Sequence, residues 1–193
     1  MRKVLASLKP YYYYLVGEGI KKIEVRKDMP KASDWDNEVL FYMSKDEKSF
    51  AKIPKEYQEK YRKHFGKVGM KFICDKVERL EEHIEQGGLY YILSDTFNEQ
   101  AQLDNWELHD YGKGKTLYGW HISDLKIYDK PRELSEFKKT KERIARTCGM
   151  QARNGLCCAI DHEELCDNIK CCFKTPCPPQ SWCYVEELQE KEK

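Results

Sequence analysis

Hydrophobic and polar residues alternate over several short stretches in the first two thirds of the chain. The run Lys22–Arg26 alternates strictly, which predicts a half-buried strand with Ile23 and Val25 pointing inward. Aromatic and β-branched residues gather in further segments that also predict strands. These segments are residues 38–43, 71–73, 89–93, 116–128 and 182–185.

Three short helices are predicted between these strands. Ser7 can cap the first helix, which has Pro10 in its first turn and a glycine at its end. The second follows Pro54, and the third is a short acidic helix within residues 77–85. Many short strands with interspersed helices predict an α+β fold, namely a small, partly closed mixed β-barrel with peripheral helices.

The charge is balanced overall but unevenly distributed. The chain has 34 Lys plus Arg against 33 Asp plus Glu, a formal net charge of +1. Residues 1–71 sum to +7 and residues 72–110 to −8. A basic face of this kind is compatible with nucleic-acid binding, and ordinary solvated surface charge explains it equally well.

The chain shows no membrane or export signal that we recognise. No stretch approaches the roughly 18–20 uncharged apolar residues that cross a bilayer, and the first ten residues lack the apolar core of a secretory signal. We therefore expect a soluble, cytoplasmic protein that does not bind membranes and is a monomer.

Eight of the nine cysteines lie between Cys148 and Cys183, and Cys74 stands apart. This density predicts that residues 138–177 form a small insertion held together by a structural Zn²⁺ ion, because a reducing cytoplasm favours thiolates over disulfides. Four ligands are expected from Cys148, Cys157, Cys158, Cys166, Cys171 and Cys172. His162 is a substitute ligand, and an iron–sulfur cluster or disulfides remain as alternatives.

One motif resembles a known family. Gly-x-Lys-x-x-Glu-x-Arg marks ASCH domains, a branch of the PUA-like superfamily, and is matched here by Gly19, Lys21, Glu24 and Arg26. Val39–Ser44 is similar to the second strand of that family. Gly119–Ile122 is similar to a late strand of its phage and prophage members.

The resemblance implies a PUA-like barrel over residues 1–137, closed by a last strand around residues 178–188. It also implies a cleft beside the first helix and strand that holds RNA or a modified base, and a bacterial or phage-infected cytoplasm. The residues support this independently, because two cations on one strand face can meet phosphates while Glu24 orients Arg26 or accepts from a base amine. A strand facing water would show the same alternation and bind nothing.

We therefore predict a nucleic-acid-binding module, with RNA favoured over DNA and single-stranded or modified bases as the target. The predicted binding residues are Lys9, Lys21, Lys22, Glu24, Arg26, Lys27, Ser44, Trp120 and His121.

Two other functions remain as alternatives. Some ASCH proteins resemble hydrolases that use the motif lysine and a hydroxyl three residues later, but Glu24 occupies that position here, which argues against amide hydrolysis through an acyl intermediate. A ribonuclease or another nucleotide hydrolase with Lys21, Glu24 and Arg26 as catalytic residues stays open. The third reading is a phage-type module that binds a protein partner.

Overall fold

The structure is a computed structural model that describes residues 2–30, 35–85, 88–91, 93–94, 96–139, 178–179 and 181–187. Within these ranges the chain forms a mixed α+β fold with eleven strands, five α-helices and one short 3-10 helix. Among the described residues, no helix is long and apolar enough to cross a membrane.

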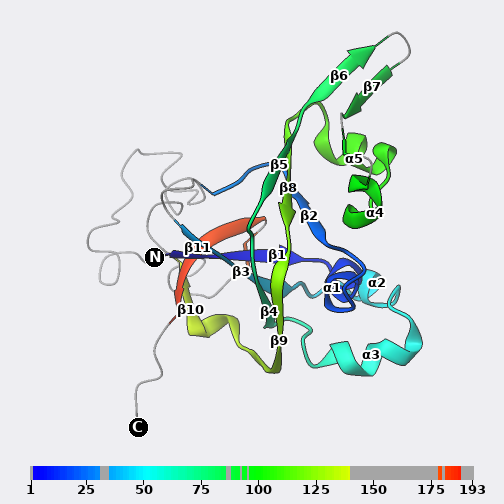
Figure 1. Ribbon diagram of the computed structural model, residues 1–193. Helices are drawn as coiled ribbons and strands as arrows, with labels where there is room; N and C mark the ends of the chain where they lie inside the picture. The colour runs from blue at the N-terminus through cyan, green and yellow to red at the C-terminus, as the bar shows by residue number, and fades with distance from the viewer. Residues whose placement is uncertain are drawn as a thin grey trace, which may run out of the picture.

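The largest sheet has six strands in the order β10-β11-β1-β3-β4-β9. Its strands are β1 (Arg2–Leu8), β3 (Trp35–Met43), β4 (Val68–Ile73), β9 (Ser123–Arg132), β10 (Phe137–Lys139) and β11 (Trp182–Glu187). β1 pairs in parallel with β3 and antiparallel with β11, so it lies inside the sheet (Figure 1). The last described strand, β11, therefore packs beside the first, β1.

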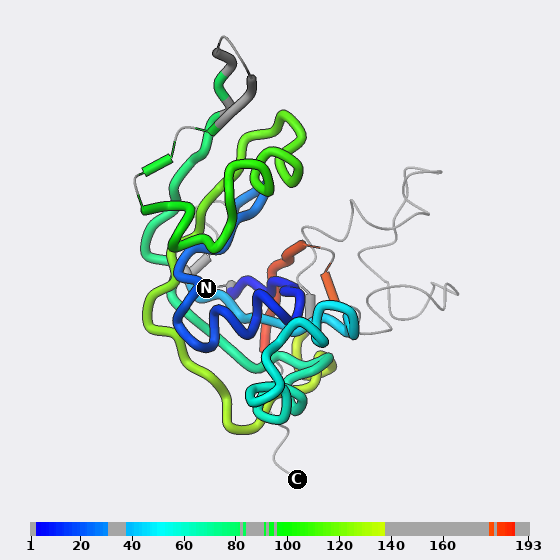
Figure 2. The backbone as a smooth tube through the Cα atoms, turned by 90° about the vertical axis from the view of Figure 1, so that its right-hand side faces the viewer, coloured from blue at the N-terminus to red at the C-terminus, as the bar shows by residue number. Residues whose placement is uncertain are grey.

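A second sheet contains β2 (Ile23–Arg26), β8 (Leu117–His121) and β5 (Val77–Leu80), in the order β2-β8-β5. A hairpin of β6 (Glu82–Glu85) and β7 (Gly88–Tyr91) extends from its end. The helices are α1 (Pro10–Gly17), α2 (Glu47–Phe50), α3 (Lys55–Arg62), α4 (Phe97–Ala101) and α5 (Asn105–Gly112), and η1 (Leu134–Glu136) is the 3-10 helix. In Figure 2, α4 and α5 lie near β2, whereas α3 lies at the opposite end of the molecule.

Both faces of the large sheet are buried in its central strands. Val4 and Phe41 point to one face and pack with Tyr13 of α1, while Leu5 and Leu40 point to the other. Because β1 is buried on both faces, its residues do not alternate in polarity, and the sequence pattern does not predict this strand.

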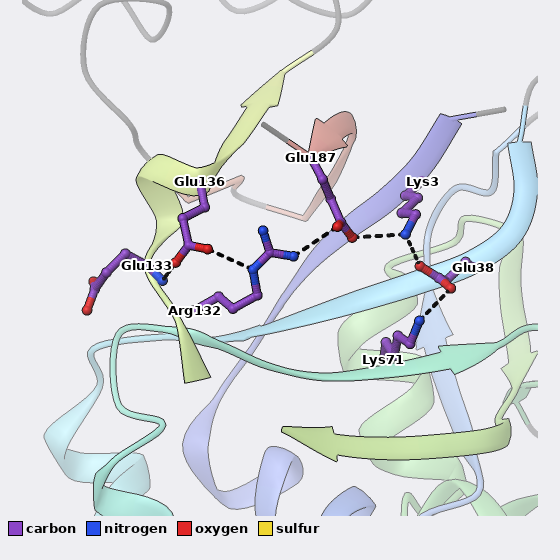
Figure 3. Close-up of polar contacts among 7 residues, drawn as sticks. All are labelled: Lys3, Glu38, Lys71, Arg132, Glu133, Glu136 and Glu187. Atoms are coloured by element: carbon purple, nitrogen blue, oxygen red, sulfur yellow. Dashed lines mark hydrogen bonds and ion pairs between the residues drawn. The ribbon is translucent and has the colours of Figure 1, made fainter. Parts of the chain in front are cut away.

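A chain of ion pairs joins five strands at one end of the sheet (Figure 3). Lys3 Nζ lies 2.6 Å from Glu38 Oε1 and 2.9 Å from Glu187 Oε1. Glu38 also pairs with Lys71 at 3.0 Å, and Glu187 with Arg132 at 2.9 Å. Burial alone would lower the pKa of Lys3, but its two carboxylate partners raise it above the ordinary value.

The sheets do not close into a barrel over the described residues, where a partly closed barrel was predicted. β9 and β10 are the two edges of the large sheet, and β8 belongs to the other sheet although it directly precedes β9. The chain leaves one sheet for the other at Ile122, and Asp124 then adopts a positive φ of 47°. The segment 116–128, predicted as a strand, is thus two strands in two sheets.

Three further predictions of secondary structure differ from the structure. Residues 77–85 form β5 and β6 rather than a helix, because Val77 and Leu80 pair with β8. Ser7 is a strand residue, and Lys9 stands at the N-cap of α1. Helices α4 and α5 were not predicted, although Asp104 and Glu107 form a capping box, the sequence signature of a helix start.

A buried polar pair lies beneath α1. The hydroxyl of Tyr13 is 3.0 Å from His64 Nδ1, and His64 is 1% exposed. A side chain at Gly69 would collide with both groups, so glycine permits this close packing. Burial, and then the charges of Lys63 and Lys60, lower the pKa of His64 to about 4.

We predict that His64 makes the fold acid-sensitive. In the unfolded chain this imidazole binds a proton near pH 6.5, whereas in the native protein the His64 imidazole stays neutral down to about pH 4. The unfolded state therefore holds more protons in that window, and stability falls by up to about 3 kcal/mol as pH drops through it.

Urea unfolding at pH 7, 6, 5 and 4 measures this loss. His64→Gln should flatten the dependence whatever its own stability, because the comparison uses the slope of each variant. Parallel slopes for the two proteins would contradict the assignment.

Candidate functional site

A cleft of about 1170 Å³ lies where the two sheets meet, between α5, β2, the end of β1, the end of β3 and the turn at η1. Basic side chains on its lining are Lys9, Lys21, Arg26, Lys27, Lys45 and Lys113. Acidic side chains are Glu24, Glu107, Asp110 and Glu133, and the aromatic rings are those of Tyr12, Tyr42 and Tyr111. The charged side chains of the lining thus have a small excess of cations.

The strand β2 places its charged residues in the cleft through its alternation. Ile23 and Val25 are buried in the cluster that contains Leu117 of β8. Glu24 and Arg26 point the other way and line the cleft. The positive φ of 70° at Gly19 lets the chain turn out of α1 before β2 begins.

Three charged side chains form a buried cluster in the floor of the cleft. Lys21, Glu24 and Arg26 are 2%, 6% and 5% exposed. Glu24 lies between the two cations, with Oε1 2.9 Å from Arg26 Nε and Oε2 3.7 Å from Lys21 Nζ. Both cations thereby pair with the same carboxylate, which offsets part of the cost of burying their charges.

Arg26 also connects the two sheets. Its Nη2 donates to the carbonyl of Ser7 in β1 at 2.8 Å, and its Nη1 donates to the carbonyl of Ser181, just before β11, at 3.2 Å. All three guanidinium nitrogens therefore contact the protein. The position of Arg26 fixes β2 against the end of β1.

Lys21 is held in an environment that disfavours its charge. Its Nζ donates to the carbonyl of Ala101 at the end of α4, and lies 5.4 Å from the centre of the Tyr12 ring. Burial lowers the pKa of Lys21, the neighbouring Arg26 lowers it further, and Glu24 opposes both.

The accessible recognition groups lie at the rim. Lys27 follows β2 and is exposed, and its Nζ stands 4.7 Å from the centre of the Tyr111 ring on α5. Tyr111 is 38% exposed. Burial raises the pKa of the Tyr111 hydroxyl, so this ring stays neutral at physiological pH.

The structure brings together six of the nine predicted nucleic-acid-binding residues. Lys9, Lys21, Glu24, Arg26, Lys27 and Ser44 all line the cleft. Sequence reasoning missed Tyr111 and Lys113, because α5 was not predicted, and Tyr12, which is one of four consecutive tyrosines.

Three predicted residues lie outside the cleft. Trp120 is fully buried against Trp182, with ring centres 6.1 Å apart, so it presents no face to a ligand. His121 Nε2 lies 2.8 Å from Glu78 Oε1. Lys22 is exposed and precedes β2, where its backbone N–H donates to Gln100 rather than continuing the alternation. We withdraw these three from the candidate site.

The predicted zinc ligands, from Cys148 to Cys172, lie outside the described residues. Within the described ranges, no group of three or more His, Cys, Asp or Glu side chains is arranged to hold a metal ion. The zinc assignment therefore remains a prediction from sequence. Cys74 and Cys183, the two cysteines within the described ranges, are both buried.

Among known proteins, the chain is similar to solved structures. No family model and no curated protein matches the chain. A crystal structure of ASCH from Zymomonas mobilis is similar, with a TM-score of 0.47 and 14% identity over 98% of this chain and 90% of that one.

Crystal structures of two single-residue variants of the same Zymomonas mobilis protein are similar as well. One has a TM-score of 0.48 and 13% identity over 98% of this chain and 92% of that chain. The other has a TM-score of 0.47 and 13% identity over 97% and 89%. These three structures are thus of one ASCH protein, and likenesses of this degree carry no argument about function.

The buried cluster predicts a ranked loss of stability. Glu24→Gln leaves two buried cations without a counter-charge and should lower the free energy of unfolding by about 3–5 kcal/mol. Lys21→Met keeps the Glu24–Arg26 pair and should cost less. Urea unfolding at pH 7 measures both changes.

Lys22→Gln serves as the matched surface control and should change stability by no more than about 0.5 kcal/mol. If Glu24→Gln changed the free energy of unfolding as little as this control, Glu24 would not stabilise the two buried cations.

Proposed function

We propose that this protein is a nucleic-acid-binding module that holds single-stranded RNA in the cleft between the two sheets. The observation that carries the proposal is the buried cluster of Lys21, Glu24 and Arg26 in the floor of a cleft whose rim presents Lys27 against Tyr111. The preference for RNA over DNA rests on the resemblance of this motif to ASCH domains.

The rim has the groups that bind single strands. An unpaired base stacks on an exposed aromatic ring, and the backbone phosphates are attracted by nearby cations, a combination that does not require base-pair geometry. Tyr111 and Lys27 supply one such pair. Lys9 and Lys45 are further exposed cations on the lining.

The acidic residues of the lining suit bases rather than phosphates. Glu107 and Asp110 lie on α5 beside Tyr111 and are exposed. Their carboxylates would repel a phosphate but accept hydrogen bonds from the exocyclic amines of a base. We therefore place the base at α5 and the backbone toward β1.

Salt-dependent binding tests this function. A fluorescein-labelled single-stranded RNA of ten nucleotides should bind with an affinity that falls as salt rises. Lys27→Ala should weaken binding about 3- to 10-fold and reduce the salt slope by about one charge. Fluorescence anisotropy from 50 to 200 mM KCl measures both.

Lys22→Ala is the matched control, because it removes an equally exposed lysine five residues away that lies outside the cleft. Its affinity should equal that of the unmodified protein. Equal losses in the two variants would indicate general charge attraction, and a DNA strand of the same sequence tests the RNA preference.

Hydrolysis in the same cleft is the second candidate, favoured by the lowered pKa of Lys21. A neutral amine beside a carboxylate can take a proton from an attacking hydroxyl, and buried groups with shifted pKa values concentrate at catalytic sites. Lys21 would be the base and Glu24 the group that positions it. Arg26 would act from a fixed position, since its nitrogens already contact the protein.

If the cleft hydrolyses RNA, turnover at saturating substrate should rise with pH and level off below 10.5, the ordinary pKa of lysine. Lys21→Met should abolish cleavage of the ten-nucleotide RNA while retaining binding, as followed on denaturing gels. Cleavage by Lys21→Met at the original rate, or none by the unmodified protein, would reject this candidate and leave binding.

A further inference from the structure

The lining of the cleft reaches beyond Tyr111 and Lys27. The cleft has a volume of about 1170 Å³ and is continuous from α5 to the turn at η1. Ser44, Lys45 and Gly66 belong to the same lining, so a ligand at Tyr111 and Lys27 does not account for all of it.

The contacts between its elements give the cleft two ends. Tyr111 of α5 contacts Lys27 after β2, and Arg26 donates to the carbonyl of Ser7 in β1. On the other side of β1, the backbone N–H of Ser44 donates to the carbonyl of Leu8 at 2.9 Å. The order across the cleft is thus α5, β2, β1 and the end of β3.

The far end has its own polar groups. Lys45 lies across Gly66 so closely that a Cβ there would collide with its stem, so the absence of a side chain at Gly66 lets the lysine lie along the wall. Ser44 Oγ is hidden from solvent and forms no hydrogen bond within the described residues. A hydroxyl without a partner is costly, and rotation about χ1 would let a bound ligand satisfy it.

We infer that the cleft has two nucleotide subsites, one at Tyr111 and Lys27 and a second at Ser44 and Lys45. This inference rests on the proposed function and specifies its substrate class as an oligonucleotide rather than a free nucleotide. Lys9 follows β1 between the two ends and is exposed, so it is placed to contact the phosphate that joins the two nucleotides.

Competition with ligands of increasing length tests the inference. Adenylate and uridylate oligonucleotides of one, two and four residues displace the labelled ten-nucleotide RNA. The dinucleotide should act at a concentration at least 10-fold below that of the mononucleotide, because it occupies both subsites.

Two variants assign the subsites. Ser44→Ala removes an unpartnered hydroxyl, so its stability should be unchanged or higher, and it should weaken the dinucleotide about 3- to 10-fold while leaving the mononucleotide within 2-fold. Lys45→Met keeps the stem over Gly66, removes the charge and should show the same pattern. Lys27→Ala should weaken ligands of both lengths.

Each failure has a distinct signature. Equal displacement by mononucleotide and dinucleotide, with the ten-nucleotide RNA still bound, would overturn the second subsite and leave the proposed function intact. Loss of mononucleotide binding in Ser44→Ala would also overturn it. If no RNA of any length binds the unmodified protein, the proposed function falls and takes this inference with it.

Discussion

The rest of the structure depends on the ion pairs that the carboxylate of Glu24 forms with Lys21 and Arg26. Glu24 pairs with both Lys21 and Arg26, neither of which is more than 5% exposed, and so offsets part of the cost of burying these two cations. Arg26 in turn donates to carbonyls at β1 and just before β11, whereas β2 itself hydrogen-bonds in the other sheet. The two sheets are therefore held together at this point by charged hydrogen bonds. Removing the carboxylate would leave both cations buried without a counter-charge, which would destabilise the fold.

The pairing of the buried charges gives the floor and the rim of the cleft different roles. The floor charges satisfy one another and the backbone, so they fix the shape of the cleft more than they attract a ligand. In the proposed function, the exposed cations Lys27, Lys9 and Lys45 attract the RNA, and Tyr111 stacks on a base. Under that proposal, the motif lysine, glutamate and arginine shape the site without supplying most of its affinity.

Strict alternation was enough to predict β2 and the shared face of Glu24 and Arg26, because side chains two positions apart in a strand point the same way. It did not predict that this face lines the cleft, nor that all four residues of β2 are buried. It failed at Lys22, where the backbone turns to donate to Gln100 and Lys21 takes the inward place. Trp120 is the register partner of Glu24, yet Trp182 of β11 covers it, and only tertiary structure shows that contact. Long-range pairing likewise explains why β1 and the open six-stranded sheet were not predicted.

Through β11, residues far apart in the sequence contribute to the cleft. Ser7 Oγ donates to the carbonyl of Pro179 at 2.7 Å, and the backbone N–H of Ser7 donates to the carbonyl of Ser181 at 3.0 Å. Pro178 and Pro179 line the cleft, although more than 150 residues separate them from β2. Closing so long a loop costs conformational entropy, which the antiparallel β1–β11 ladder and the Arg26 contact must offset. The cleft therefore reaches its final geometry only when β11 docks, and residues at both ends of the chain contribute to one site.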